Sequence, residues 1–278
     1  MLDLHHLRLP GACIVEQLGR FERLGFVDLS WADMTRTVLF KDYGNVLLRH
    51  VRTLKGLSLR DTNVGGDKET ILGLQQLNNL VYLDLSKPNS RNQNHELCFK
   101  DDFSSLKKLN NLVWLNFGGN LVGDQTVKTI CHNIPSLRHL GLACCPITSK
   151  GIESLIEVPL KTLDITGCRN ISDEGFSNLL NVETSKCAQN VHTLLCSFLN
   201  QVRSTKSSML LLDLPCLQVI EMRMTRACPT AIKFLRFKLH TAIFEHTDQL
   251  KYQQTPDMYS RFGVNQVFDH LSWPYYKR

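Results

Sequence analysis

The sequence predicts an α/β solenoid, in which stacked units each place one short parallel strand on one face and one helix on the opposite face. The main observation is that the motif Leu-x-x-Leu-x-Leu recurs along the chain. Clean copies occupy residues 54–59, 80–85, 112–117, 137–142 and 160–165, and weaker copies occupy residues 4–9, 24–29, 191–196 and 217–222. Successive copies are 20 to 32 residues apart, in or near the range of leucine-rich repeats. We therefore expect a leucine-rich-repeat solenoid of about eight or nine units.

The elements follow from the side-chain pattern of each unit. The anchor leucines point inward from a short strand, and no unit can bury its apolar face alone, so neighbouring units must stack. Residues 124–130, 151–156 and 173–180 have apolar side chains at three-to-four spacing and an Asp or Ser near the start. That pattern predicts capped helices on the convex face. We expect the repeats to occupy residues 1–228, followed by a C-terminal cap and tail at 229–278.

Charge and hydropathy exclude several classes of function. The 278 residues are 43% hydrophobic and 21% charged, which is typical of a globular protein. The net charge is +6, and the chain has no dense Lys/Arg tract. No run of about eighteen apolar residues is present. We therefore expect neither a nucleic-acid partner nor a membrane partner.

The cysteines indicate the cellular compartment of the protein. Ten cysteines occur without a Cys-x-x-Cys pair, and several fall on interior positions of the repeat. Such residues are interpreted as free thiols in a reducing environment. We expect a protein of the cytoplasm or nucleus.

Motifs for catalysis or cofactor binding are missing from the sequence. The Gly65-Gly66 and Gly118-Gly119 pairs lack the spacing of a phosphate-binding loop, and no Gly-x-Ser-x-Gly motif is found. The adjacent pairs His5-His6 and Cys144-Cys145 would diverge on a strand, and no second pair lies at a metal-site spacing. We expect no catalytic residue, no metal and no cofactor.

The strand pattern predicts the binding surface. The residues that flank the second anchor of each motif should point to the concave face. Those before the anchor include Phe26, Tyr82, Trp114 and His139, and those after it include Asp28, Asp84, Asn116, Asp164 and Glu221. Exposed aromatic side chains beside a polar, acidic row have the composition of a protein-binding patch. We expect a protein or peptide ligand with a basic or mixed apolar and basic contact segment, although any single Asp is equally well explained as a solvated surface residue.

Two further segments have no clean repeat. Residues 86–95 form a polar insert, interpreted as an exposed loop that is either a tolerated insertion or an overhang above the concave face. Residues 231–239 are interpreted as a capping helix or strand, and the polar and aromatic tail that ends at residue 278 as a disordered end or a docking peptide.

Two units carry a finer signature, at residues 142–152 and 165–176. They resemble the cysteine-containing subclass of leucine-rich repeats, found in F-box/leucine-rich-repeat proteins and in the zygote-defective/Zer family of cullin substrate receptors. Cys145 and Cys168 would take the corner after the strand, where other units have Thr62 and Asn120. The order of features over residues 54–180 is closer to the zygote-defective family.

The resemblance implies a substrate-recognition or adaptor subunit of a cullin-RING E3 ubiquitin ligase. The docking box of that family has the form Leu-x-x-x-Cys, and residues 9–13 and 212–216 match this spacing but contain proline. Terminal-residue recognition by that family rests on C-terminal helices, and no residue here corresponds to them. The alternatives are a stand-alone scaffold or inhibitor-like binding protein and, by analogy of fold, a GTPase activator that uses Arg60.

Overall fold

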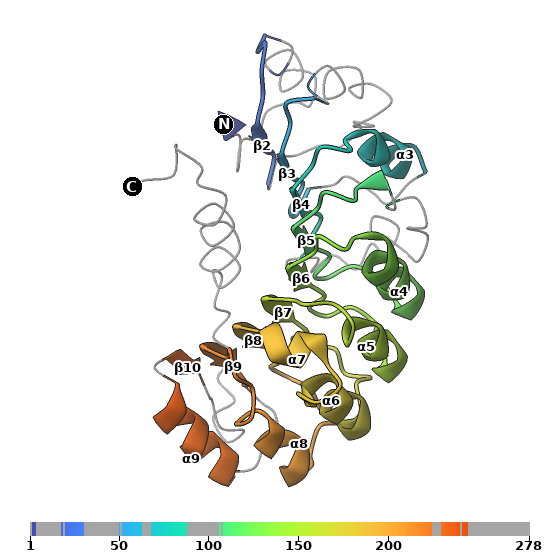
Figure 1. The fold of residues 1–278 in the computed structure, drawn as a ribbon. Helices are drawn as coiled ribbons and strands as arrows, with labels where there is room; N and C mark the ends of the chain where they lie inside the picture. Colours follow the sequence, from blue (N-terminus) through green and yellow to red (C-terminus); the bar gives the residue numbers. More distant parts are fainter. Residues whose placement is uncertain are drawn as a thin grey trace.

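The protein is a curved stack with a single parallel sheet along its inner side (Figure 1). The computed structural model describes residues 2–3, 18, 20–30, 50, 52–62, 68–87, 106, 108–223, 229–239 and 241–243. Within this part of the chain the sheet has ten strands in sequence order. They are β1 (Leu2–Asp3), β2 (Phe26–Asp28), β3 (Gly56–Ser58), β4 (Tyr82–Asp84), β5 (Trp114–Asn116), β6 (His139–Gly141), β7 (Thr162–Asp164), β8 (Thr193–Leu195), β9 (Val219–Glu221) and β10 (Thr241–Ile243).

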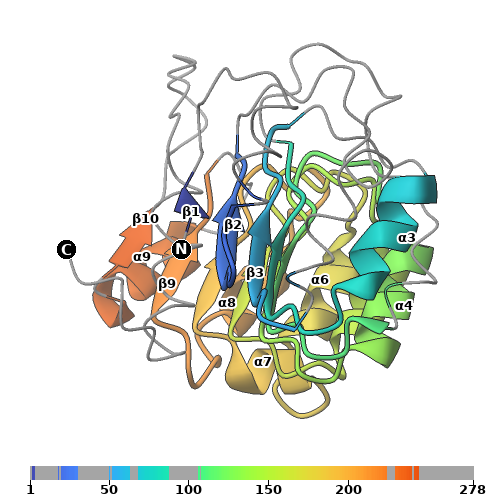
Figure 2. The same cartoon turned by 90° about the horizontal axis from the view of Figure 1, so that it is seen from above.

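Helices form the outer layer of the stack. Figure 2, which looks down the stack, shows α3 and α4 outside the strands. The helices are α3 (Lys68–Gln76), α4 (Asp124–Asn133), α5 (Ser149–Leu155), α6 (Asp173–Leu180), α7 (Lys186–Asn190), α8 (Thr205–Leu210) and α9 (Pro229–Lys238). The expected α/β leucine-rich-repeat solenoid is confirmed. None of the helices in the described ranges combines the length and the apolar character that a membrane span requires.

The strand register confirms the phase of the motif. The second anchors pair in one row across β2 to β9, and all of them are buried in a continuous apolar core: Val27, Leu57, Leu83, Leu115, Leu140, Leu163, Leu194 and Ile220. Because parallel pairing aligns equivalent residues, the flanking residues form rows as well.

The start of the sheet differs from the expectation, whereas the segment at residues 231–239 has the helix that was one of its two expected forms. At the start, Leu2 pairs with Val27, five residues before the predicted anchor Leu7. Alternating leucines offer competing anchors there, and only pairing with β2 selects one. The weak motif at residues 4–9 lies outside the described residues. After residue 228, helix α9 is followed by β10, which pairs with β9 and continues the sheet.

Polar contacts join neighbouring helices at their first turn. Asp124, the first residue of α4, accepts hydrogen bonds from the backbone N (2.7 Å) and Oγ1 (2.6 Å) of Thr148, which caps α5. A Cβ atom at Gly151 would lie only 2.5 Å from the Asp124 carboxylate. Asp173 of α6 likewise accepts from the backbone N of Ser204, the cap of α8, at 2.8 Å. The glycine and the acidic residue of these units therefore maintain the spacing between helices.

Candidate functional site

The aromatic row predicted for the concave face is formed. The ring centroids of Tyr82 and Trp114 lie 4.3 Å apart with planes at 12°, so the rings stack. Phe26 comes from two strands before Tyr82, yet its ring centroid is 5.4 Å from that of Tyr82. Gly56 occupies the intervening strand, and a Cβ atom there would overlap the Phe26 ring. A glycine on β3 therefore allows three aromatic rings to meet.

The expectation that these rings are exposed is wrong. Tyr82 is 2% exposed and Trp114 is 7% exposed, and Phe26 is also buried. Strands in a sheet lie about 4.8 Å apart, so flat side chains on neighbouring strands stack face to face and remove each other from solvent. His139 follows in the same row, where its Nδ1 is 2.9 Å from Oγ1 of Thr162, and it is buried too. The row stabilises the sheet instead of forming an open patch.

The polar row has a structural role. In four units the side-chain oxygen after the second anchor accepts a hydrogen bond from the backbone N–H two residues later. The pairs are Asp28 with Ser30 (2.8 Å), Asp84 with Ser86 (2.9 Å), Asn116 with Gly118 (2.9 Å) and Asp164 with Thr166 (2.9 Å). Short polar side chains satisfy backbone groups in this way where regular pairing ends.

The side chains of the polar row are also too buried to contact a ligand. Asp84, Asn116, Asp164 and Glu221 are buried, and Asp28 is half-buried. Glu221 pairs with Nε of Arg223 at 2.9 Å. The row is therefore not the exposed acidic surface that the sequence predicted for a basic segment.

Burial raises the pKa of Asp84 from 3.8 to about 6, while the nearby positive charge of Arg60 and the bond from Ser86 lower it. Arg60 is itself only partly exposed. Its positive charge therefore lies near a buried carboxyl group of the sheet.

The four predicted corner residues are confirmed as hydrogen-bond donors to backbone carbonyl groups. The bonds are Thr62 Oγ1 to Leu59 O (2.7 Å), Asn120 Nδ2 to Leu85 O (2.8 Å), Cys145 Sγ to Phe117 O (3.4 Å) and Cys168 Sγ to Leu142 O (3.1 Å). Burial raises the pKa of Cys145 to about 12 and also raises the pKa of Cys168. These thiols are therefore neutral donors within the core. Each cysteine among the residues that the structure describes carries a free thiol.

The residue before each corner has an unusual backbone conformation. Five units have a positive φ there: Asp61 (53°), Gly119 (79°), Cys144 (57°), Gly167 (73°) and Phe198 (60°). The backbone N–H of Phe198 donates to the carbonyl of Arg223 at 2.8 Å, which ties this turn to the next unit. A bulky side chain is rare in the left-handed region, because its Cβ crowds the backbone. Phe198 is nevertheless 43% exposed.

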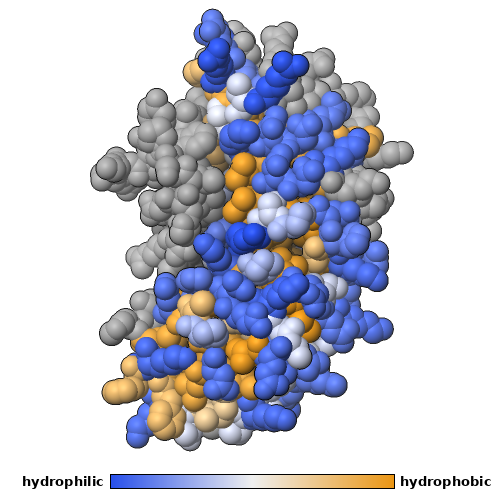
Figure 3. Space-filling view, in the orientation of Figure 1, coloured by the Kyte–Doolittle hydropathy of each residue, from blue (hydrophilic) through white to orange (hydrophobic). Residues whose placement is uncertain are grey.

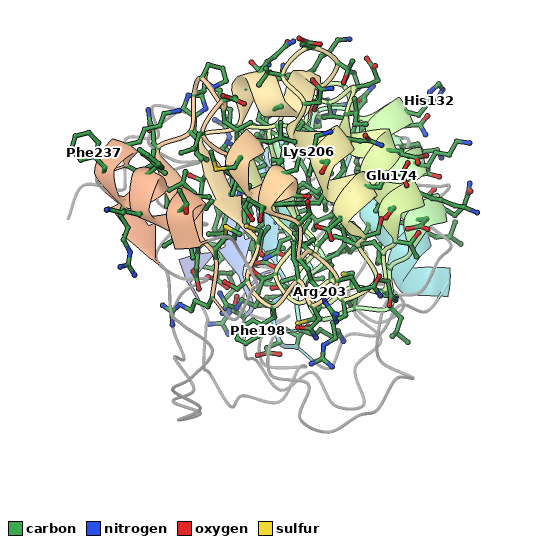
Figure 4. The ribbon with its side chains drawn as sticks, turned by 90° about the horizontal axis from the view of Figure 1, so that it is seen from below. His132, Glu174, Phe198, Arg203, Lys206 and Phe237 are labelled. Carbon is green, nitrogen blue, oxygen red and sulfur yellow. The ribbon has the colours of Figure 1, made fainter. Side chains whose placement is uncertain are left out.

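Phe198 lies on an open edge of the solenoid, which we call the strand-end edge and define by the loops at residues 143–149, 166–172 and 197–204. These loops contain no Asp or Glu. Their exposed residues are Cys144, Pro146, Arg169, Asn170, Phe198, Asn200, Gln201 and Arg203. Figure 4 shows Phe198 and Arg203 on the same edge. The sequence prediction missed this edge, although aligning residues 196–199 with 165–168 places Phe198 opposite Gly167.

The other segments that the sequence analysis singled out are only partly described by the structure. Residues 212–216, one of the two Leu-x-x-x-Cys segments, lie outside any helix, and Leu214 is fully buried. The other, at 9–13, falls outside the described residues, as do most of the insert at 86–95 and the tail after residue 243. Ser86 and Lys87, at the start of the insert, are buried. Within the described ranges, no three His, Cys, Asp or Glu side chains gather to form a metal site.

Comparisons with known proteins agree with this architecture. The family model described as Leucine Rich repeat matches residues 133–155 and 159–180. Internalin C2 of Listeria monocytogenes is 17% identical, with 83% of this chain and 84% of that chain covered and a TM-score of 0.51. A chain of the Rad7 and Elc1 complex in yeast is 15% identical (86% and 68% covered, TM-score 0.48). A chain of the TLR13–ssRNA13 complex is 20% identical (73% and 33% covered, TM-score 0.41).

The matched repeats and the likeness to internalin C2 agree with the parallel register of the sheet and with the corner hydrogen bonds. The protein is therefore a leucine-rich-repeat solenoid.

Proposed function

We propose that this protein is a non-catalytic recognition module that binds another protein through the strand-end edge. The observation that carries the proposal is Phe198, which is 43% exposed with a φ of 60°. Exposed aromatic and arginine side chains dominate the energetics of protein interfaces. The edge supplies both, because Arg169 and Arg203 are exposed on the same set of loops.

The backbone conformation at Phe198 supports this role. A non-glycine residue in a sparsely populated region costs about 1–3 kcal/mol, and such residues cluster at functional sites. At the equivalent position Gly119 and Gly167 adopt the same conformation without that cost. An aromatic side chain is therefore present at a position where stability alone favours glycine.

The charge of the strand-end edge indicates the chemistry of the partner's contact segment. Its loops hold arginines, amides and apolar side chains and contain no acidic residue. A contact segment with an apolar side chain and one or two carboxylates would pair with Arg169 and Arg203. This partner chemistry replaces the basic segment predicted from the polar row, since that row is buried and bonded to strand ends.

The finer role is that of a substrate-recognition or adaptor subunit of a cullin-RING E3 ubiquitin ligase. Its support is the resemblance of residues 142–152 and 165–176 to repeats of such receptors. The corner bonds of Cys145 and Cys168 are the contacts that this repeat subclass would require. The alternative role is a stand-alone scaffold or inhibitor-like protein, which would use the same edge.

The test is affinity purification of the tagged full-length chain from cells, with mass spectrometry of bound proteins. The variant Phe198→Gly removes the aromatic ring and relieves the backbone, so we expect it to remain folded, and thermal denaturation of the same sample checks this. Phe21→Ala is the matched control, since Phe21 has a similarly exposed ring (42%) and lies outside the strand-end edge. We expect Phe198→Gly to reduce partner recovery at least about tenfold, while the control retains it.

The identity of the bound proteins separates the roles. A cullin and its adaptor support the ligase subunit, and another partner lost only in Phe198→Gly supports the scaffold. Equal recovery by all three proteins would contradict binding through the strand-end edge.

A further inference from the structure

Helix α9 ends the described series of convex helices. It begins nine residues after the strand anchor Ile220, as α4 and α5 do after Leu115 and Leu140. Positions in the three helices therefore correspond one to one. The inward positions of α9 are occupied by Ala231 and Leu235, which are both fully buried. This face packs on the solenoid as in the earlier helices.

The outward positions of α9 differ from those of its counterparts. At the positions fourteen and seventeen residues after the anchor, α4 has Thr129 and His132. The unit of α5 has Ser154 and, just after the helix ends, Glu157. Helix α9 has Phe234 and Phe237. Phe234 is 54% exposed and Phe237 is 93% exposed. In Figure 4 the labelled Phe237 projects away from the ribbon at the edge of the molecule. The counterparts in α4 and α5 have polar residues at the surface, so two exposed phenylalanines on α9 require an explanation.

The charged residues of helix α9 all have one sign. Helix α9 contains Lys233, Arg236 and Lys238 and no acidic residue. Nζ of Lys238 also donates to the carbonyls of Leu212 and Leu214, which fastens the helix to the turn after α8. Met209 of α8 is a further exposed apolar residue. Figure 3 shows apolar surface gathered over α9 and α8 at the lower left.

We propose that the outward face of α9, formed by Phe234, Phe237, Lys233 and Arg236, binds an acidic amphipathic helix of a partner protein. The partner helix would lie across this outward face. Its apolar residues would cover the two rings, and its carboxylates would pair with the lysine and the arginine. This surface is separate from the strand-end edge and does not depend on the function proposed there.

The spacing of the two rings favours a helix as the occupant. Phe234 and Phe237 are three residues apart and lie on one helical ridge, which fits between the ridges of a second helix. The face is one side of a ten-residue helix whose other side is buried, so it presents little apolar area to a lipid surface. A protein helix of opposite charge satisfies both the rings and the basic residues.

The test uses the full-length chain and a fluorescent synthetic peptide of about five helical turns, with leucine on one face and glutamate on the others. The double variant Phe234→Thr/Phe237→His carries the residues that α4 has at these positions, so its melting temperature should match that of the wild type. We expect anisotropy titration to give a Kd at least about tenfold weaker for this variant.

Charge is tested separately. We expect Lys233→Glu to weaken peptide binding severalfold. Lys128→Glu is the matched control, because Lys128 is exposed at the corresponding position of α4, and it should leave the Kd unchanged. A peptide with lysine in place of glutamate should bind at least about tenfold more weakly than the acidic peptide.

Other occupants are measured in parallel. A Kd weaker than about 1 mM, or equal affinity for the wild type and the double variant, would overturn the proposal. Binding to phosphatidylserine vesicles that is lost in the double variant would also overturn it, in favour of a membrane surface. Dimerisation in sedimentation experiments that the double variant abolishes would assign the face to a second copy of this chain.

Discussion

Two sets of aromatic side chains have opposite environments in this solenoid. Phe26, Tyr82 and Trp114 lie on the concave strands and are buried, whereas Phe198 and Phe237 lie on a loop and a helix and are exposed. The concave rings stack because the sheet holds them at a regular spacing and Gly56 leaves room for Phe26. A concave position therefore does not ensure exposure. The side chains on neighbouring strands decide it.

Loss of a stacked ring should produce the largest effect on stability. We expect Trp114→Ala to lower the free energy of unfolding by about 3–5 kcal/mol, because it empties a packed site beside Tyr82. Urea denaturation measures the change. Phe237→Ala is the control, since that ring is 93% exposed and its removal should change stability by about 0.5 kcal/mol or less. Similar values for the two variants would contradict the distinction between the two sets.

The buried carboxyl of Asp84 should make stability depend on pH. Its folded pKa of about 6 lies above the ordinary value of 3.8, so between these values the folded protein binds more protons than the unfolded chain. Stability attributable to this group therefore falls as pH rises from about 4 to about 6 and stays low above that, by up to about 3 kcal/mol.

Asp84→Asn tests this effect directly. Asn116 makes the same bond in the next unit, so the variant should retain the strand-end contact. We expect denaturation between pH 4 and pH 7 to show a smaller decrease in stability for the variant. An unchanged pH dependence would show that Asp84 titrates normally.

Gly56 provides a finer test of the stack. We expect Gly56→Ala to destabilise the protein by about 1–3 kcal/mol, because the new Cβ would overlap the ring of Phe26. In the background of Phe26→Ala the same substitution should have a smaller effect. A double-mutant cycle by urea denaturation measures this coupling, and additive effects would place the strain elsewhere.

The smallest effect on stability is expected for a substitution of Phe198. Phe198→Gly should leave the free energy of unfolding unchanged or raise it by about 0.5–1 kcal/mol, because glycine adopts a φ of 60° without steric cost. Thermal denaturation of this variant and of Cys144→Gly measures the change. A clear loss of stability would show that the exposed ring packs on the fold and is not held for a partner.

Much of the architecture was predictable from spacing alone. Leu57, Leu83, Leu115, Leu140 and Leu163 identified the strands, their order and the residues that share each row, because the repeat imposes one register. The corner roles of Cys145 and Cys168 followed from their place in the unit and are confirmed by their hydrogen bonds. At the N-terminal end, where several leucines compete, the predicted anchor was wrong.

The candidate site was harder to predict because exposure is a property of neighbours. Tyr82 and Trp114 have the composition of a binding patch, yet they cover each other. Asp84 and Asp164 have the composition of an acidic surface, yet each bonds to the backbone two residues later. In the sequence Phe198 is an ordinary apolar residue. Its unusual position becomes visible only when its unit is aligned with the unit that has Gly167 at the same place.

The sequence by itself determined the repeat, the strand register and the corner chemistry, because these depend on short-range spacing that every unit shares. Only the tertiary structure decided which side chains reach solvent. Burial depends on the units stacked on either side, and a glycine in one strand or two phenylalanines on the outward face of a helix change it without altering the motif.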